Sequence, residues 1–539
     1  MRRLQAGKPP LLEGLLSALL AAGAAAASPE PAAEERWYLL ELGGRSAGWA
    51  VERWWSDGGE TVTEAEVSLR LARADSVLEI AMSGRFVETE AGEPVSLRLR
   101  RSLGSDPIET TYRFLPDRVE AETLQAGRVR EEALPLPAGE WLTPGEARRA
   151  VRRHHRAGDA GYRVRTIDPI EGLEPITVTR TRLEEDAPSP AGAGAETAAR
   201  WREELSSAPG TESIVELDAA GDLIRSTTEI LGLEATLRRS DRETALAASG
   251  PGPDVLLPTL LRPDRPLPSP RRITRAVYEL TLAGGGELPD LPAAGGQRVE
   301  RRGDRLRVAV ETRPRGRRAS DGAAAAGRLP PSDQDGAGAF ASYLAASAYL
   351  DHDDPEIRRL LAEVLPGARR PADADPVPHG KRAGGPPEDR PADEGARPAA
   401  ELAARLTELV RAHVARKDLD TGFATASEVA RERSGDCTEH SVLLAALLRA
   451  AGLPSRVVTG LVYLEEFAGA EGVFGYHMWV QAWADGRWLD LDATLPGGFD
   501  ATHIALATSD LAGPEAGGEL DRLLPLVGKL EIRVLEVEP

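Results

Sequence analysis

Residues 36–135 alternate between apolar and polar side chains in short runs such as RWYLLEL, TVTEAEVSLRLA and PVSLRLRRSL. A period of two residues is typical of strands that bury one face. Turn-forming residues separate the runs, as at Asp57-Gly58-Gly59. The pattern predicts an antiparallel meander, which is interrupted by a short helix that begins near Pro144 because proline favours the first turn of a helix.

The alternation returns beyond residue 160, in YRVRTIDP, EPITVTRTRLEE, ESIVELD and LIRSTTEIL. We therefore expect residues 36–250 to form one β-rich N-terminal domain built on a curved, open sheet. A proline-rich segment at about 251–270 is predicted as a hinge. Two further alternating runs predict a small β module at 271–315.

Residues 316–398 are predicted as partly disordered linkers around a helical segment, because their outer stretches are rich in Pro, Ala, Gly and Arg. The segment AAELAARLTELVRAHVARK at 399–417 has the spacing of an amphipathic helix. Residues 511–539 are expected to form a C-terminal strand or tail.

The N-terminus has the features of a signal peptide. Arg2, Arg3 and Lys8 precede an apolar stretch that ends in Ala25-Ala26-Ala27, a small-residue cleavage site. We predict a signal peptide at residues 1–27 and a periplasmic or secreted mature chain; the alternative is an Ala/Pro-rich tail. No other stretch approaches the roughly 18 apolar residues that span a bilayer, so no stable membrane span is expected.

The composition narrows the classes of function. A chain of 539 residues is longer than one core usually supports, and its hydrophobic fraction of 41% is sufficient for globular domains. The net charge of −20 argues against nucleic-acid partners and against attraction to anionic lipid. The lysines number only four, Lys8, Lys381, Lys417 and Lys529, so the protein offers few amines as acyl acceptors of its own. The composition does not predict an oligomeric state.

Cys437 is the only cysteine in the chain, and it is either a buried small side chain or a reactive thiol. It lies in SGDCTEHSVLLAALL, where Asp436 and Glu439 have the spacing of a helix capping box. Cys437 is therefore expected at the first residue of a buried helix. The helix dipole should lower its pKa below the usual value of about 8.5, and backbone N–H groups there can hold an oxyanion.

A cysteine nucleophile needs a base and a group that orients the base. His477 lies in the alternating segment YHMWVQAW, which the turn Asp485-Gly486 joins to RWLDLDATLP. A two-residue turn places Asp492 diagonally opposite His477 on the same face, within reach of its ring. A three-residue loop would move Asp492 to the other face.

Other residues could take these roles. His440 lies one helical turn from Cys437, and His503 follows the second strand, so each is an alternative base. Asp490 shares the face of Asp492 and is an alternative orienting acid. The single cysteine and scattered histidines lack the usual spacing of metal ligands, so we expect no metal and no cofactor.

The blocks GDCTEHSVLLAALLRAAGLPSRVVTGLVY, YHMWVQAW and WLDLDAT together resemble the bacterial transglutaminase-like superfamily, a branch of the papain-like thiol enzymes. The resemblance covers about residues 400–500 well. It implies an α+β fold at 340–510, interrupted by the linker at 366–398, with the cysteine helix packed on an antiparallel sheet. It also implies the catalytic residues Cys437, His477 and Asp492. One departure is Asp492-Ala493-Thr494, where the family often has Asp-Pro-Thr.

This resemblance implies acyl transfer at peptide or protein amide bonds through an acyl-thioester. We expect water to resolve the thioester more often than an amine, which makes the protein an exported bacterial cysteine hydrolase. The alternative is a catalytically weak protein that uses the same fold and the β domain to recognise peptides or the cell envelope.

Overall fold

A computed structural model describes residues 33–73, 76–103, 107–125, 127–184, 197–208, 211–230, 233–247, 250, 252–312, 340–365, 399–417, 419, 423–511 and 526–539. The predicted signal peptide lies outside the described residues, as do most of the predicted linkers. Within the described ranges, no helix is both long and apolar enough to cross a membrane.

The N-terminal region is one antiparallel sheet of 14 strands in the order β8-β7-β6-β5-β4-β3-β2-β1-β14-β13-β12-β11-β10-β9. The strands are β1 (Glu34–Leu42), β2 (Arg45–Asp57), β3 (Glu60–Arg73), β4 (Ser76–Thr89), β5 (Pro94–Leu103), β6 (Ile108–Phe114), β7 (Val119–Gln125), β8 (Arg128–Leu134), β9 (Gly161–Thr166), β10 (Ile176–Arg182), β11 (Ala199–Leu205), β12 (Glu212–Leu217), β13 (Leu223–Ile230) and β14 (Leu233–Ser240).

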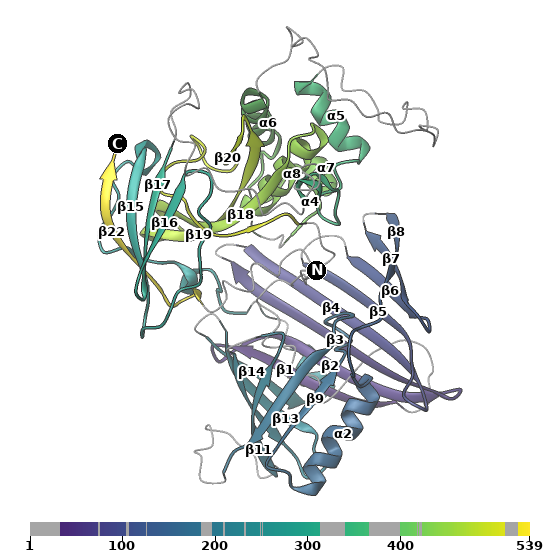
Figure 1. The fold of residues 1–539 in the computed structure, drawn as a ribbon. Helices are drawn as coiled ribbons and strands as arrows, with labels where there is room; N and C mark the ends of the chain where they lie inside the picture. Colours follow the sequence, from purple (N-terminus) through teal and green to yellow (C-terminus); the bar gives the residue numbers. More distant parts are fainter. Residues whose placement is uncertain are drawn as a thin grey trace, which may run out of the picture.

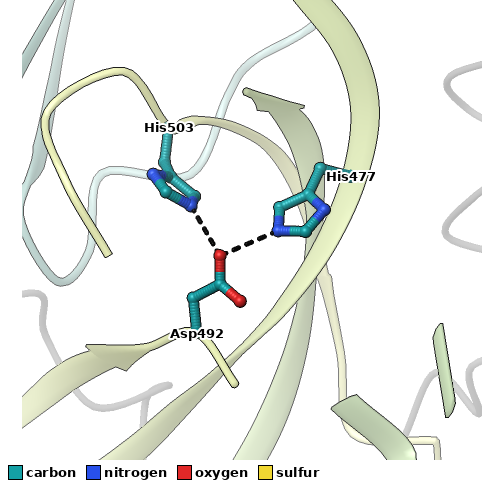
Figure 2. A group of neighbouring side chains, drawn as sticks. All are labelled: His477, Asp492 and His503. Atoms are coloured by element: carbon teal, nitrogen blue, oxygen red, sulfur yellow. Dashed lines mark hydrogen bonds and ion pairs between the residues drawn. The ribbon is translucent and has the colours of Figure 1, made fainter. Parts of the chain in front are cut away.

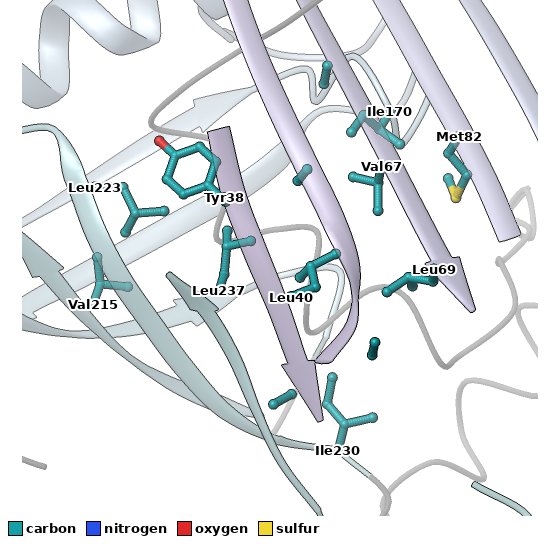
Figure 3. Close-up of a cluster of buried hydrophobic side chains, with 14 of the residues drawn as sticks. Tyr38, Leu40, Val67, Leu69, Met82, Ile170, Val215, Leu223, Ile230 and Leu237 are labelled. Carbon is teal, nitrogen blue, oxygen red and sulfur yellow. The ribbon is translucent and has the colours of Figure 1, made fainter. Parts of the chain in front are cut away.

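Two meanders make up this large sheet. The first runs outward from β1, the second returns to it, and they join where Leu40 pairs with Leu237. Helix α2 (Pro144–Ala157) connects the two edge strands and begins at the predicted proline. Its Ala147, Ala150 and Val151 pack into the main core, part of which Figure 3 shows between the two meanders. A short helix, α3 (Arg242–Ala247), follows the last strand. The predicted antiparallel, β-rich fold is confirmed.

A second, small sheet has the order β16-β17-β15-β22. Its strands are β15 (Arg275–Leu282), β16 (Gln297–Arg302), β17 (Arg305–Glu311) and β22 (Leu530–Glu538). The first three come from the predicted small module, whereas β22 comes from the C-terminal segment and pairs with β15. The polypeptide between β17 and β22 therefore leaves this sheet and returns to it, as Figure 1 shows.

The C-terminal region contains the helices α4 (Ala341–Leu344), α5 (Pro355–Val364), α6 (Ala399–His413), α7 (Ala426–Glu432) and α8 (Cys437–Ala450), and a sheet of β18 (Ser455–Phe467), β19 (Ala470–Ala484), β20 (Arg487–Leu491) and β21 (Ile504–Ser509). In Figure 1 the helices lie on one side of this sheet and the small sheet lies on the other. The predicted helical segment before residue 366 is split into α4 and α5. Helix α5 cannot extend backwards past Pro355, because the residue before a proline avoids helical geometry, and Asp354 caps it instead.

Residues 252–261, here called the strap, connect the large sheet to the C-terminal sheet. The backbone N–H groups of Gly252 and Val255 donate to β3, over 2.7 and 3.0 Å. Leu261 exchanges two backbone hydrogen bonds with Phe474 of β19, of 2.9 and 2.7 Å. A short 3-10 turn, η2 (Leu257–Thr259), lies within the strap, and another, η3 (Pro270–Arg272), follows it. The segment predicted as a hinge is thus bonded to both neighbours.

Candidate active site

Cys437 is the first residue of α8, and a capping box fixes the start of this helix. The N–H of Thr438 donates to Oδ1 of Asp436 over 2.8 Å, and the N–H of Asp436 donates to Oε2 of Glu439 over 2.9 Å. Gly435 has a φ of 133°, and a Cβ there would meet Cγ of Glu439 at 2.3 Å. The predicted capping box is confirmed, and it requires the preceding glycine.

The thiol of Cys437 is half-buried, and its pKa lies well above the ordinary value. Loss of surrounding water is the largest cause, and the negative charges of Asp436 and Glu439 act in the same direction. A hydrogen bond from the backbone N–H of Met478 and the charge of Arg73 oppose the shift. The predicted lowering of the thiol pKa is therefore wrong, because burial and the neighbouring carboxyl groups outweigh the contributions of Met478 and Arg73.

The hairpin of β19 and β20 has the predicted register. Ala484 pairs with Arg487, and Val480 pairs with Leu491. Asp485 and Gly486 form the two-residue turn, with φ values of 51° and 76° that suit a type I′ turn. Asp492 follows the last residue of β20 directly. The turn thus determines which face of the sheet carries the carboxylate.

His477 and Asp492 are brought together as the turn predicts. Nε2 of His477 lies 3.0 Å from Oδ2 of Asp492, a contact that Figure 2 marks with a dashed line, and both side chains are buried. The backbone N–H groups of Thr494 and Leu495 donate to Oδ1 of Asp492 over 2.6 and 3.2 Å. Burial alone would raise the pKa of Asp492, but the two histidines hold it well below its usual range. Asp492 is thus an ionised, fully bonded carboxylate.

His503 is a second partner of the same carboxylate oxygen. Its Nε2 lies 3.0 Å from Oδ2 of Asp492, and its Nδ1 lies 3.0 Å from the backbone oxygen of Asp500 (Figure 2 shows the first contact). Arg271 pairs with the Asp500 carboxylate over 2.5 Å. Burial lowers the pKa of His503, but its bonds to Asp492 and Asp500 outweigh this and raise it to about 9. His503 is therefore a cation at neutral pH.

Asp490 fixes the position of Trp479, an aromatic side chain next to His477. Its Oδ1 accepts hydrogen bonds from Trp479 over 3.1 Å and from Gln481 over 2.7 Å, and its Oδ2 accepts one from Gly296 over 2.8 Å. Trp479 in turn stacks against His477, with ring centroids 6.2 Å apart. The structure thus pairs His477 with Asp492 and engages Asp490 in supporting a neighbouring aromatic ring.

The alternative base His440 is buried on α8, where its Nδ1 lies 2.7 Å from the backbone oxygen of Asp436. Sequence reasoning considered His503 only as a base and missed its bond to Asp492. The spacing Asp500-x-x-His503, after the turn that ends the hairpin, is the local signal that could have suggested a fixed ring there.

The ligand atoms of His477, Asp492 and His503 lie within 4.8 Å of one another, a spacing that a metal ion can use. However, Oδ2 of Asp492 already accepts from both rings at 3.0 Å, and the His503 cation balances its charge. The N–H groups of the two rings thus account for the close approach of His477, Asp492 and His503 without a metal ion. The expectation of no metal remains a prediction.

Residues 389–493 match the family model of the transglutaminase-like superfamily, so this part of the chain is a transglutaminase-like domain. The family and fold class predicted from the sequence are confirmed. A comparison with curated proteins found no match.

Among solved structures, one similar chain is a β-barrel-like protein of a domain of unknown function from Brucella abortus. It is 12% identical with a TM-score of 0.30, over 39% of this chain and 96% of that one. Another is a candidate cysteine protease from Cytophaga hutchinsonii, 14% identical with a TM-score of 0.24, over 49% of this chain and 86% of that one.

Proposed function

We propose that this protein is a cysteine hydrolase that cleaves peptide or protein amide bonds, with Cys437 as nucleophile, His477 as base and Asp492 as orienting carboxylate. The observation that carries the proposal is the 3.0 Å contact between Nε2 of His477 and Oδ2 of Asp492. Because Nε2–H donates to the carboxylate, the neutral ring keeps its lone pair on Nδ1, the atom that can take a proton.

The raised thiol pKa favours attack by a neutral thiol over a preformed thiolate. As Sγ of Cys437 bonds to the carbonyl carbon, its proton moves to Nδ1 of His477. The imidazolium then gives this proton to the leaving amine, the C–N bond breaks, and an acyl-thioester remains. Water adds to the thioester carbonyl, His477 accepts and returns its proton, and the thiol is released with a carboxylic acid product.

Water is the acceptor that we propose, although an amine can resolve the same thioester. A cross-linking enzyme must favour a lysine amine over water at about 55 M, which requires an oriented amine site. The four lysines of this chain also make self-cross-linking a minor reaction. We further propose that the substrates lie outside the cytoplasm, because the N-terminal sequence has the features of a signal peptide.

The test is incubation of the mature protein with casein and a fluorescent cadaverine, with Cys437→Ala as the blank. We expect Cys437-dependent cleavage of casein that exceeds labelling. Strong Cys437-dependent labelling without cleavage would assign amine transfer instead. Mass spectrometry of a glutamine-containing peptide library, with and without a primary amine, then identifies the bond that is attacked.

A second candidate is a peptide- or envelope-binding protein with weak catalysis, which the burial of Cys437 beside two carboxyl groups favours because both disfavour the nucleophilic thiolate. The two candidates differ in the reactivity of the thiol. A working nucleophile beside a base is alkylated by iodoacetamide much faster than a free cysteine of equal pKa, and His477→Ala removes that advantage. Equal rates in the wild type and in His477→Ala would favour the binding protein.

A further inference from the structure

The end of β3 reaches from the large sheet to the helix that carries Cys437. Arg73 is the last residue of β3, yet its Nη2 lies 3.0 Å from Oδ2 of Asp436, 363 positions later. Its Nη1 donates to the backbone oxygen of Leu419 over 3.2 Å. The side chains of Arg73 and Asp436 are only 20% and 10% exposed. Water screens such a pair less than it screens a surface pair.

The strap holds this strand end against the C-terminal sheet. It donates backbone hydrogen bonds to β3 at its start and pairs with Phe474 of β19 at its end. Phe474 lies three positions before His477 on the same strand. The guanidinium of Arg73 is thus placed by backbone contacts that are continuous with the strand carrying His477.

The position of Asp436 gives this contact a chemical consequence. Its carboxylate caps α8 through Oδ1 and lies one residue before the thiol, while Oδ2 receives Arg73. Glu439 on α8 and the backbone of Met478, which follows His477 on β19, also act on the thiol. The positive charge of Arg73 lowers the pKa of the Cys437 thiol and so favours the thiolate.

We propose that Arg73 of the N-terminal sheet is a positioning residue for the nucleophile, because its guanidinium fixes the cap of α8 and offsets the charge of Asp436. The inference rests on the proposed function in that it takes Cys437 as the reacting group. It gives the N-terminal sheet a direct part in the reactivity of the site, in addition to any part in substrate recognition.

The experiment follows the rate of iodoacetamide alkylation against pH in the full-length chain. Arg73→Ala should raise the apparent pKa of the thiol and slow alkylation near neutral pH about three- to tenfold, as expected for loss of one partly screened countercharge. Arg73→Lys keeps the charge and should retain most of the rate. Arg70→Ala is the matched control, because Arg70 lies on the same strand and pairs with the exposed Glu79.

An alkylation profile of Arg73→Ala identical to that of Arg70→Ala would overturn the proposal. If Arg73→Ala does not fold, Arg73→Met keeps the apolar stem of the side chain and tests the charge alone. Casein cleavage is measured in parallel with Cys437→Ala as blank. Absence of cleavage in the wild type would refute the proposed hydrolysis, whereas the alkylation profiles would still decide the role of Arg73.

Discussion

Glu52 in the large sheet and Asp492 in the C-terminal domain are both buried carboxyl groups, yet their pKa values move in opposite directions. Glu52 accepts a hydrogen bond from the Tyr38 hydroxyl over 2.6 Å. Burial raises its pKa to about 8, although Tyr38 and the charge of Arg36 oppose the shift. Asp492 receives two histidine rings and two backbone N–H groups, and its pKa falls despite burial.

The opposite pKa shifts of Glu52 and Asp492 indicate what allows a buried carboxyl group to ionise. Burial disfavours the charged form at both positions, so the outcome depends on how many donors and cations surround each group. A neutral carboxylic acid such as Glu52 can serve only as a hydrogen-bond partner for another buried polar group. An ionised one requires dedicated partners, and Asp492 has four of them, two histidine rings and two backbone N–H groups.

Replacement of the carboxyl group by an amide should have different consequences at Asp492 and at Glu52. The larger effect on turnover is expected at Asp492. Asp492→Asn should preserve the fold and reduce turnover about 10⁴-fold, because an amide cannot hold the His477 tautomer or stabilise the imidazolium. Casein cleavage measures the effect, and circular dichroism checks the fold. Asp490→Asn is the comparison. If it proves damaging while Asp492→Asn is nearly silent, the assignment of the orienting carboxylate is wrong.

At Glu52, substitution by glutamine should leave turnover unchanged and alter the pH dependence of stability. The folded pKa of about 8 exceeds the ordinary value of 4.5, so between these values the folded protein retains a proton that the unfolded chain releases. Wild-type stability should therefore fall as pH rises through this window, by up to about 1.4 kcal/mol per pH unit relative to Glu52→Gln.

Calorimetry near pH 5 and near pH 8 measures this difference, with Glu60→Gln on the exposed end of β3 as control. A constant gap between Glu52→Gln and the wild type at the two pH values would show that Glu52 is ionised in the folded protein. The contrast with Asp492 would then be lost.

Removal of the second histidine should reduce turnover much less than Asp492→Asn does. His503→Gln can still donate one hydrogen bond but loses the positive charge, and we expect a decrease in turnover of roughly tenfold, about the value of one charge-assisted hydrogen bond. The ratio of wild-type to variant turnover should shrink above about pH 9, where His503 itself loses its proton. A ratio that is constant across this range would limit His503 to a packing role.

Local pattern was sufficient to predict much of the site. The capping box around Cys437 and the turn at Asp485-Gly486 each act over a few residues, so the sequence alone predicted the helix start and the hairpin register, and both are confirmed. The antiparallel character of the first half follows from period-two alternation in the same way. The catalytic roles of Cys437, His477 and Asp492 remain predictions that the variants above test.

Longer-range features could not be predicted in this way. The thiol pKa depends on burial and on Arg73, which reaches Asp436 from 363 positions away, and no local spacing encodes such a contact. His503 lies across an irregular loop from Asp492, where neither strand nor helix periodicity determines direction. The pairing of β22 with β15 likewise joins segments whose individual patterns indicate strands but not partners.

That pairing also constrains the order of folding. Thr281 and Glu531 meet across β15 and β22, although 250 positions separate them. Closing an unstructured loop costs conformational entropy that grows with the logarithm of its length, so this contact forms late unless the intervening chain is already compact. Prior folding of the transglutaminase-like domain shortens the effective loop and brings the two strands together. The small sheet is thus completed by β22 only after the transglutaminase-like domain has folded. A mutation that unfolds this domain should also separate β22 from β15.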